Sequence, residues 1–270
     1  MSTAPEGRRL VPLRSTCAHP HRCSREVRMR VLAQVPLFTG LSTDELAGID
    51  ERMVSLSWAH DDVLYTAGEP AEHLYLLAAG RAKAFQPTPA GHDVVVALLV
   101  PGDLFGGLRT LGQPTRTETV QALTTTCALR IESSAFRDVL TAHPSIALRL
   151  LDDTNALLVQ ARSDVTQQST ATIAQRVATT LLRLADRLGQ ERADGSTLIQ
   201  VPLSRKDLAG MTGSTPESVS RVMSRLRKDG VIASGRRWTA ILDRERLTEV
   251  AAAADAGGAV SAALPRPAVD

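Results

Sequence analysis

The stretch 204–228, SRKDLAGMTGSTPESVSRVMSRLRK, constrains this chain more than any other part, because it predicts two short helices joined by a tight turn. Ser204 can cap the first helix, and Asp207 follows three residues later, as in a capping box. Gly213 supplies the break, and Thr215 can cap the second helix, with a proline directly after it. The segment therefore predicts a helix-turn-helix, the unit that places its second helix in a DNA major groove.

The second of these helices has an apolar face and a polar face. The face expected to be buried follows i, i+3, i+4, i+7 spacing and consists of Val219, Val222, Met223 and Leu226. The opposite face carries polar side chains that are free to reach base edges. With the basic residues around them, the residues expected to contact DNA are Arg205, Thr215, Glu217, Ser218, Ser220, Arg221, Arg225 and Arg236.

The charge of this region agrees with that expectation. From Ser204 to Arg237 there are eight Lys or Arg and three acidic residues, a net charge of +5, whereas the whole chain carries only +2. Positive charge supplies affinity for phosphates, and the polar helix face supplies the choice of sequence. An ordinary helical hairpin with a solvated basic face would show the same local pattern, so the rest of the chain has to decide.

Upstream, the segment from Val54 to Ile131 consists of short apolar runs cut by Gly, Pro and Asp. Many short strands at this spacing predict a sandwich or a jelly-roll barrel. The expected strands are Asp62–Thr66, Leu74–Ala78, Arg81–Phe85, Val94–Leu99, Val120–Leu123 and Cys127–Ile131. Helical spacing predicts helices on both sides of them, at Glu26–Gln34, from Ser42 through Met53, at Ser134–Thr141, from Ser145 to about Ser169 and at Thr172–Leu188.

The long helix after Pro144 carries a heptad pattern. Leu151, Leu158 and Val165 recur every seven residues, with Thr154 and Ala161 between them. Such a seam favours a partner helix, and a dimer also suits a symmetric DNA site, so we expect a homodimer. The alternative is that this helix only packs on its own barrel.

The remaining elements complete a winged domain. Strands are expected at Leu198–Leu203, Val231–Ile232 and Trp238–Leu242, with a polar loop at Gly189–Ser196 and a wing around Arg236. The predicted fold class is α+β: an N-terminal β jelly-roll, a long dimerisation helix and a C-terminal winged helix-turn-helix. The expected divisions are a flexible Cys/His arm at 1–30, the barrel at 31–142, the dimerisation helix at 143–170, the winged domain at 171–250 and a disordered tail at 251–270.

Bulk properties exclude several classes of protein. No apolar run is long enough to span a membrane, and no apolar segment follows the N-terminal arginines, so we expect a cytoplasmic chain without membrane association. Three cysteines are too few for a disulfide scaffold. No phosphate-binding loop, G-x-S-x-G, H-E-x-x-H or paired-carboxylate motif is present, which argues against an enzyme.

Five short motifs carry a resemblance to a known family: 35–38 (VPLF), 68–72 (GEPAE), 101–106 (PGDLFG), 203–209 (LSRKDLA) and 215–221 (TPESVSR). With the order of the elements, they resemble the cyclic-AMP receptor and fumarate–nitrate reduction regulator (CRP/FNR) family over roughly 31–247. The resemblance implies that the jelly-roll is a cyclic-nucleotide-binding-like sensor domain. It also implies a homodimeric transcriptional regulator with double-stranded DNA and RNA polymerase as partners.

The resemblance also implies which bases are read. In the family, Glu, Ser and Arg at the positions of Glu217, Ser220 and Arg221 read a half-site similar to TTGAT. The cyclic-AMP branch has Arg at the position of Pro216 and Gly at that of Ser220, so the readout here resembles that of the fumarate–nitrate reduction branch. Chemically, Arg221 suits a guanine edge and Glu217 suits a cytosine amino group.

The sequence says less about which signal controls such a regulator. Cyclic-AMP binders of the family carry Gly-Glu-Leu and then Arg-Ser or Arg-Thr; here the matching residues are Gly106-Gly107-Leu108 and Arg116-Thr117. Arg116 and Thr117 are thus candidates for a phosphate contact, but the glutamate that holds the ribose hydroxyl is replaced by Gly107. The sequence disfavours cyclic AMP, and Arg116 could equally be a solvated loop residue.

The N-terminal arm is the other candidate sensor, since Cys17, His19, His21 and Cys23 lie within seven residues. Such ligands bind zinc or an iron–sulfur cluster. Oxygen-sensing family members hold a [4Fe–4S] cluster with arm cysteines, including a Cys-x5-Cys pair, and one barrel cysteine. Here the third arm cysteine is missing, and the barrel position falls on Leu129, two residues from Cys127. A cluster is expected first, and the alternatives are no metal, zinc or a thiol switch between Cys17 and Cys23.

Overall fold

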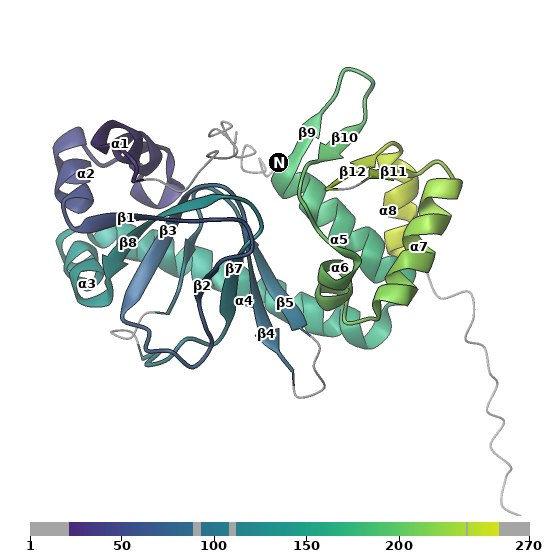
Figure 1. Ribbon diagram of the computed structural model, residues 1–270, viewed down its shortest axis with the longest axis horizontal. Helices are drawn as coiled ribbons and strands as arrows, with labels where there is room; N and C mark the ends of the chain where they lie inside the picture. The colour runs from purple at the N-terminus through teal and green to yellow at the C-terminus, as the bar shows by residue number, and fades with distance from the viewer. Residues whose placement is uncertain (1–21, 89–92, 108–111, 236, 254–270) are drawn as a thin grey trace, which may run out of the picture.

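The computed structural model describes residues 22–88, 93–107, 112–235 and 237–253. A β-barrel capped by three helices lies on one side, a winged domain lies on the other, and one long helix runs along the barrel towards the winged domain (Figure 1). Cys17, His19, His21, Arg236 and the tail beyond 253 lie outside the described residues.

The N-terminal cap of the barrel consists of α1 (Arg25–Gln34), the 3₁₀ turn η1 (Pro36–Phe38) and α2 (Thr43–Asp50). The expected capping box of α2 is confirmed: Ser42 N–H donates to Glu45 at 2.7 Å, and Glu45 N–H donates to the Ser42 hydroxyl at 3.2 Å. The expectation that this helix runs through Met53 is wrong, because Met53 is the first residue of a strand and pairs with Ile131. Its apolar side chain satisfies the alternation of a strand as well as the period of a helix.

The barrel is built from two four-stranded sheets with strand orders β1-β8-β3-β6 and β2-β7-β4-β5. All their pairings are antiparallel. The strands are β1 (Met53–Trp58), β2 (Val63–Tyr65), β3 (His73–Ala79), β4 (Ala82–Pro87), β5 (Asp93–Leu99), β6 (Leu104–Phe105), β7 (Thr119–Ala122) and β8 (Thr126–Glu132). The six predicted runs are all strands, whereas β1 and β6 were not among them.

Strand β8 shows how the barrel organises its core. Its alternate residues Cys127, Leu129 and Ile131 join a buried cluster beneath α1, α2 and the following helix α3 (Ser133–Ala142). The intervening Ala128 joins a second cluster between the sheets, which includes two tyrosines. This period of two is that of a strand buried on both faces.

Two helices connect the barrel to the winged domain. Helix α4 (Pro144–Thr170) starts one residue before its predicted first residue, because proline is tolerated in the first turn of a helix. Helix α5 (Ile173–Leu188) begins with a capping box between Thr172 and Gln175. Arg183 of α5 pairs with Asp164 near the end of α4, which ties the two helices together.

The winged domain contains β9 (Gly189–Glu191), β10 (Thr197–Ile199), α6 (Arg205–Thr212), α7 (Pro216–Lys228), β11 (Ile232–Gly235), β12 (Trp238–Ile241) and α8 (Arg244–Ala252). Its sheet order is β11-β12-β10-β9. Three expectations are corrected: the predicted polar loop 189–196 contains β9, the strand predicted to reach Leu203 ends at Ile199, and α8 was not expected. The helices pack on one core that includes Leu181, Met223 and Leu247.

The expected boundary of the arm at residue 30 falls inside α1. Ser24 caps this helix, and Cys23 before it is buried, so the part of the arm from Cys23 onward belongs to the folded cap of the barrel. The sequence did not indicate this because the buried cluster that contains Cys23 also includes residues from distant parts of the chain, such as Cys127 and Leu129.

Candidate nucleic-acid interface and sensor sites

Helices α6 and α7 form the predicted helix-turn-helix. Asp207 N–H donates to the Ser204 hydroxyl at 3.0 Å, and Ser204 N–H donates to the Asp207 carboxylate at 2.9 Å, which completes the capping box. Gly213 ends α6 in the left-handed conformation, with φ 56° and ψ 45°. Thr215 then caps α7, whose first residue is Pro216. The turn chemistry predicted from the sequence is confirmed.

The two faces of α7 are divided as the periodicity predicts. Val219, Met223 and Leu226 are buried in the core of the winged domain, and Val222 is half-buried against it. On the other face, Glu217 and Arg221 are exposed, and Ser220 is half-buried. Because one face is fixed in the core, the other is held outward as a rigid row of polar groups, the geometry of a recognition helix.

A short chain of hydrogen bonds orients Arg221. The Thr215 hydroxyl accepts from Ser218 N–H at 3.3 Å and donates to the Ser218 hydroxyl at 3.2 Å. The same Ser218 oxygen accepts from Arg221 Nη2 at 3.1 Å. Ser218 thus links the helix cap to the guanidinium, and its placement suits a positioning role more than a direct base contact.

Basic residues surround this face. Arg225, Arg227 and Lys228 lie exposed in the last turn of α7. Arg205, in the first turn of α6, is half-buried, and burial together with the nearby charge of Arg227 lowers its pKa. A half-buried guanidinium beside a second one suits a partner with negative charge, such as a phosphate.

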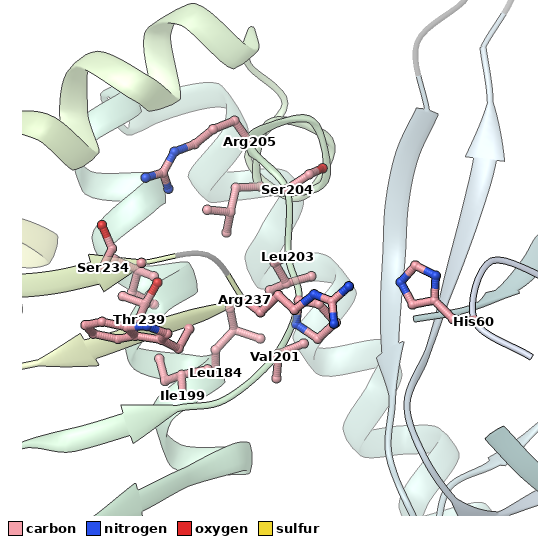
Figure 2. Close-up of a pocket in the computed structure, with 15 residues that line it drawn as sticks. His60, Leu184, Ile199, Val201, Leu203, Ser204, Arg205, Ser234, Arg237 and Thr239 are labelled. Carbon is pink, nitrogen blue, oxygen red and sulfur yellow. The ribbon is translucent and has the colours of Figure 1, made fainter. Parts of the chain in front are cut away.

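A cleft of about 370 Å³ lies between α6, the β11–β12 wing and the barrel. Figure 2 shows Arg205 and Ser204 along one side, with Ser234 and Thr239 of the wing and Arg237 on the other. Arg237 is exposed and has φ 77°, which is uncommon for a residue other than glycine. His60, from the turn between β1 and β2, faces this cleft from the barrel. Sequence patterns did not single out Arg237 or His60, because the cleft exists only in the folded chain.

In the barrel, Arg116 is buried, with 4% of its surface exposed. Its guanidinium carbon lies 3.9 Å from the ring centre of Tyr65 and 5.3 Å from that of Tyr75. Nη2 donates to the His73 carbonyl at 3.2 Å, while Nη1 has no hydrogen-bond partner among the described residues. The alternative that Arg116 is a solvated loop residue is therefore wrong, whereas Thr117 is exposed.

The surroundings of Arg116 are tight. A side chain at Gly106, which has φ 92°, would place its Cβ 2.8 Å from Arg116 Nη1. A Cβ at Gly107 would lie 2.7 Å from the Ala71 Cβ. The buried Tyr65 hydroxyl donates to Glu118 at 2.9 Å, and burial, reinforced by that carboxylate, raises the pKa of Tyr65 far above its usual value. A glutamate could not replace Gly107 without displacing its neighbours.

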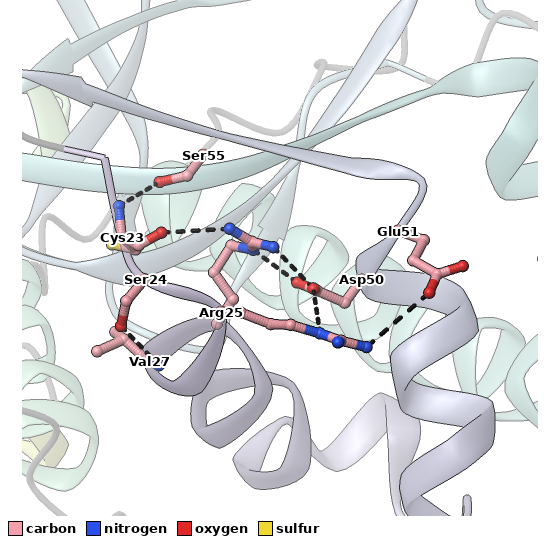
Figure 3. Close-up of polar contacts among 8 residues, drawn as sticks. Cys23, Ser24, Arg25, Val27, Asp50, Glu51 and Ser55 are labelled. Carbon is pink, nitrogen blue, oxygen red and sulfur yellow. Dashed lines mark hydrogen bonds and ion pairs between the residues drawn. The ribbon is translucent and has the colours of Figure 1, made fainter.

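The two described cysteines lie in one apolar cluster (Figure 3 shows Cys23). Cys23 N–H donates to the Ser55 hydroxyl of β1 at 3.0 Å, and the Cys23 carbonyl accepts from Arg28 at 3.2 Å. Arg28 in turn makes two hydrogen bonds to the buried Asp50, at 2.7 and 2.8 Å. These contacts hold Cys23 against β1.

Cys127 lies on the neighbouring strand, β8. Ser55 pairs with Leu129, the position that the family resemblance gives as a ligand, and Cys127 pairs with Ser57, two residues away on the same face. Within the described part of the chain, no group of three or more His, Cys, Asp or Glu is placed to hold a metal. Two of the five candidate ligands are therefore near one face of the barrel, and the other three are outside the described residues.

The predicted seam of α4 is exposed. Leu151, Leu158 and Val165 expose 65%, 50% and 66% of their surfaces, and Thr154 and Ala161 are also exposed. Leu148, Leu157 and Val159 widen this apolar surface. The alternative that these residues pack on their own barrel is therefore wrong. Among the described residues, no helix is long and apolar enough to cross a bilayer.

A barrel, a long helix and a winged helix-turn-helix define a DNA-binding regulator with an N-terminal β-barrel domain. Two family models match the chain: the cyclic nucleotide-binding domain over residues 56–143 and the Crp-like helix-turn-helix domain over residues 175–250. The chain belongs to the CRP/FNR family of transcriptional regulators.

Three similar proteins illustrate this membership. The probable transcriptional regulator flp of Lacticaseibacillus casei is 30% identical over 223 residues, which cover 81% of this chain and 97% of that protein. The CRP-like cAMP-activated global transcriptional regulator of Mycobacterium tuberculosis is 24% identical over 217 residues, 80% of this chain and 96% of the relative. The structure of FixK2 from Bradyrhizobium japonicum matches with a TM-score of 0.67 and 28% identity, over 75% of this chain and 98% of that one.

Proposed function

We propose that this regulator acts as a homodimer and reads a TTGAT-type palindrome with α7, so as to direct RNA polymerase to or from promoters. The observation that carries the proposal is the outward row of Glu217, Ser220 and Arg221 on a helix whose other face is buried. Arg221 suits bidentate binding to guanine, and Glu217 suits the amino group of cytosine. The exposed seam of α4 supports the dimer, because two-fold symmetry in the protein matches a palindromic site.

Binding to a labelled duplex tests this proposal. A TTGAT-type palindrome, a duplex with one half-site scrambled and a fully scrambled duplex are titrated with the full chain at fixed salt, and sedimentation measures the mass of the free protein. The proposal expects a dimer and tighter binding to the palindrome than to either control. Equal affinity for all three duplexes would reject the proposed sequence, and a monomeric mass for the free protein would reject the proposed assembly.

We further propose that the signal arrives at the face of the barrel where Cys23 meets β1 and β8. Two thiols, Cys23 and Cys127, lie in one cluster there, and Cys17, His19 and His21 complete the candidate ligand set. A [4Fe–4S] cluster would supply reactivity with oxygen or nitric oxide. The backbone N–H of Cys23 donates to Ser55 of β1, and α1 begins two residues after Cys23. A change at Cys23 would therefore act directly on the cap of the barrel.

Protein purified without oxygen separates the outcomes for this site. The proposal expects a brown protein with stoichiometric iron and sulfide, bleached by air, and colourless in the Cys23→Ser variant. Stoichiometric zinc, or colourless and metal-free protein whose DNA affinity does not depend on the redox state of its thiols, would reject the cluster. If the protein is colourless and metal-free but its DNA affinity changes reversibly with thiol oxidation, the cluster is rejected and a thiol switch is supported instead.

A second candidate signal is a small anion in the barrel. Buried polar groups normally have hydrogen-bond partners, and Arg116 Nη1 has none among the described residues. The Mycobacterium tuberculosis relative is described as cAMP-activated, but the narrow space at Gly107 disfavours a cyclic nucleotide here. Calorimetric titration of the full chain with cyclic AMP, and with inorganic phosphate, tests this candidate. Heat of binding that Arg116→Leu abolishes would support it, and no heat with either ligand would reject it.

A further inference from the structure

The hairpin formed by β4 and β5 holds α6, the first helix of the helix-turn-helix, through two crossed ion pairs. Lys83 Nζ of β4 lies 2.6 Å from Asp207 Oδ1, and their side chains are only 13% and 7% exposed. Lys206 Nζ of α6 lies 2.9 Å from Asp93 Oδ2 at the start of β5. Each side of the contact therefore contributes one cation and one carboxylate.

The backbones also fit closely at this contact. A Cβ at Gly210 of α6 would lie 2.5 Å from the Asp93 carbonyl oxygen and 3.1 Å from the Val95 nitrogen. Below it, Arg187 of α5 donates to the Leu98 carbonyl at 2.7 Å and pairs with Asp103. The barrel thus contacts both α5 and α6. The Lys83–Asp207 pair lies within this packed interface, whereas the Lys206–Asp93 pair lies at its edge, where the Lys206 side chain is 60% exposed.

Asp207 serves two purposes at once. Its Oδ2 accepts from Ser204 N–H and completes the cap of α6, while its Oδ1 is taken by Lys83. Burial acts to raise the pKa of Asp207, but hydrogen bonds from Lys83 and Ser204 outweigh it and leave the pKa below its ordinary value. The carboxylate is therefore ionised at neutral pH. Loss of Lys83 would leave part of its negative charge uncompensated in a largely buried interface.

Lys206 belongs both to this contact with the barrel and to the surface expected to bind DNA. It stands in the first turn of α6, and in a helix-turn-helix the first helix crosses the phosphate backbone. The Asp93 carboxylate lies 2.9 Å from the Lys206 ammonium. It offers this ammonium a negatively charged oxygen, as a phosphate would. A phosphate approaching Lys206 would also be repelled by Asp93.

We propose that the β4–β5 hairpin is an autoinhibitory clamp, in which Asp93 takes the place of a DNA phosphate on Lys206 while Lys83 anchors α6 through Asp207. DNA binding then requires the hairpin to release α6. On the other side of α6, His60 of the barrel faces the cleft that contains Arg205 and Arg237, so release also opens that basic surface (Figure 2). The inference rests on DNA binding by α6 and α7, and not on any particular base sequence.

The test removes the same ion pair from its two ends. In the full chain, Asp93→Asn frees Lys206 for phosphate and should raise the affinity for a scrambled duplex several-fold. Lys206→Ala breaks the same pair but also removes a phosphate contact, so it should weaken binding and reduce the slope of log K against log salt by about 0.9. Lys83→Met, which releases α6 from the barrel side, should also raise the affinity.

Hydrogen exchange of the α6 amides in the absence of DNA measures release directly, and should be faster in Asp93→Asn and Lys83→Met. Asp44→Asn removes an acid from the far cap of the barrel and should change neither readout. If Asp93→Asn and Lys206→Ala both weaken binding, the hairpin supports α6 in a DNA-competent position and the clamp is wrong. If Asp93→Asn changes nothing, the clamp is also wrong. Failure of every variant and of the unaltered chain to bind any duplex would instead reject DNA binding.

Discussion

At the scale of single residues, Arg221 is the side chain that we propose to read the guanine of each half-site. It is exposed on α7, and Ser218 orients it through a hydrogen bond of 3.1 Å. Arg221→Ala should weaken binding to the palindrome by about 1–3 kcal/mol per half-site and leave binding to scrambled DNA nearly intact. Competition binding with both duplexes at one salt concentration measures the difference.

The matched control is Arg225→Ala, four residues later on the same helix and also exposed. A phosphate contact carries no sequence information, so this variant should weaken both duplexes alike. An Arg221 variant that behaves like the Arg225 variant would show that α7 is not the reader.

Asp207 is the residue where stability depends on pH. Its pKa is lowered in the folded protein, so its contribution to the free energy of unfolding is present above the unfolded pKa. That contribution is lost as the pH falls from the ordinary value, about 3.9, through the lower folded value. Asp207→Asn should be less stable than the unaltered chain at pH 6 and lose less stability on acidification. Urea unfolding at pH 6 and pH 3.5 checks this, and parallel losses in both proteins would contradict it.

At the scale of elements, the seam of α4 makes the clearest prediction. Leu158 is half exposed in the single chain, and its partner in a dimer is expected to be apolar. Leu158→Glu would place an unpaired charge in that seam and should give monomers with little affinity for a palindrome. Ser163→Glu, an exposed position on the opposite side of α4, should remain dimeric. Sedimentation equilibrium measures the oligomeric state of both variants, and a dimeric Leu158→Glu protein would show that the seam is not the dimer interface.

The elements also show what a sequence can and cannot reveal. Caps and periodicity are local, so the capping boxes at Ser42 and Ser204 and the buried face of α7 were predictable. The two-residue strand β6 and the three-residue strand β9 are too short to carry a period, and only their pairing defines them, β6 with the distant β3 and β9 with the neighbouring β10. Lys83 and Asp207 lie 124 residues apart, and no local pattern could pair them.

At the scale of the whole molecule, the seam, α5 and the winged domain form a chain of rigid contacts that would set the distance between two recognition helices. Arg183 joins α5 to Asp164 of α4, and Leu181 of α5 and Met223 of α7 lie in one core. A symmetric pair of such helices reads half-sites about 34–36 Å apart, roughly one turn of DNA. In the proposed dimer, the spacing of the half-sites would therefore depend on the whole assembly and not on α7 alone.

Inserting about five base pairs between the half-sites rotates one of them by roughly half a turn, because B-DNA has about 10–10.5 base pairs per turn. The second recognition helix then faces the wrong side of the duplex, and binding should fall towards that of a single half-site. The Leu158→Glu monomer should bind the original and the lengthened duplex equally, since it has no partner helix to misplace. Anisotropy titrations of both proteins with both duplexes make the comparison. If the unaltered chain tolerates the insertion, its two winged domains are joined flexibly, and the rigid path from the seam to α7 is wrong.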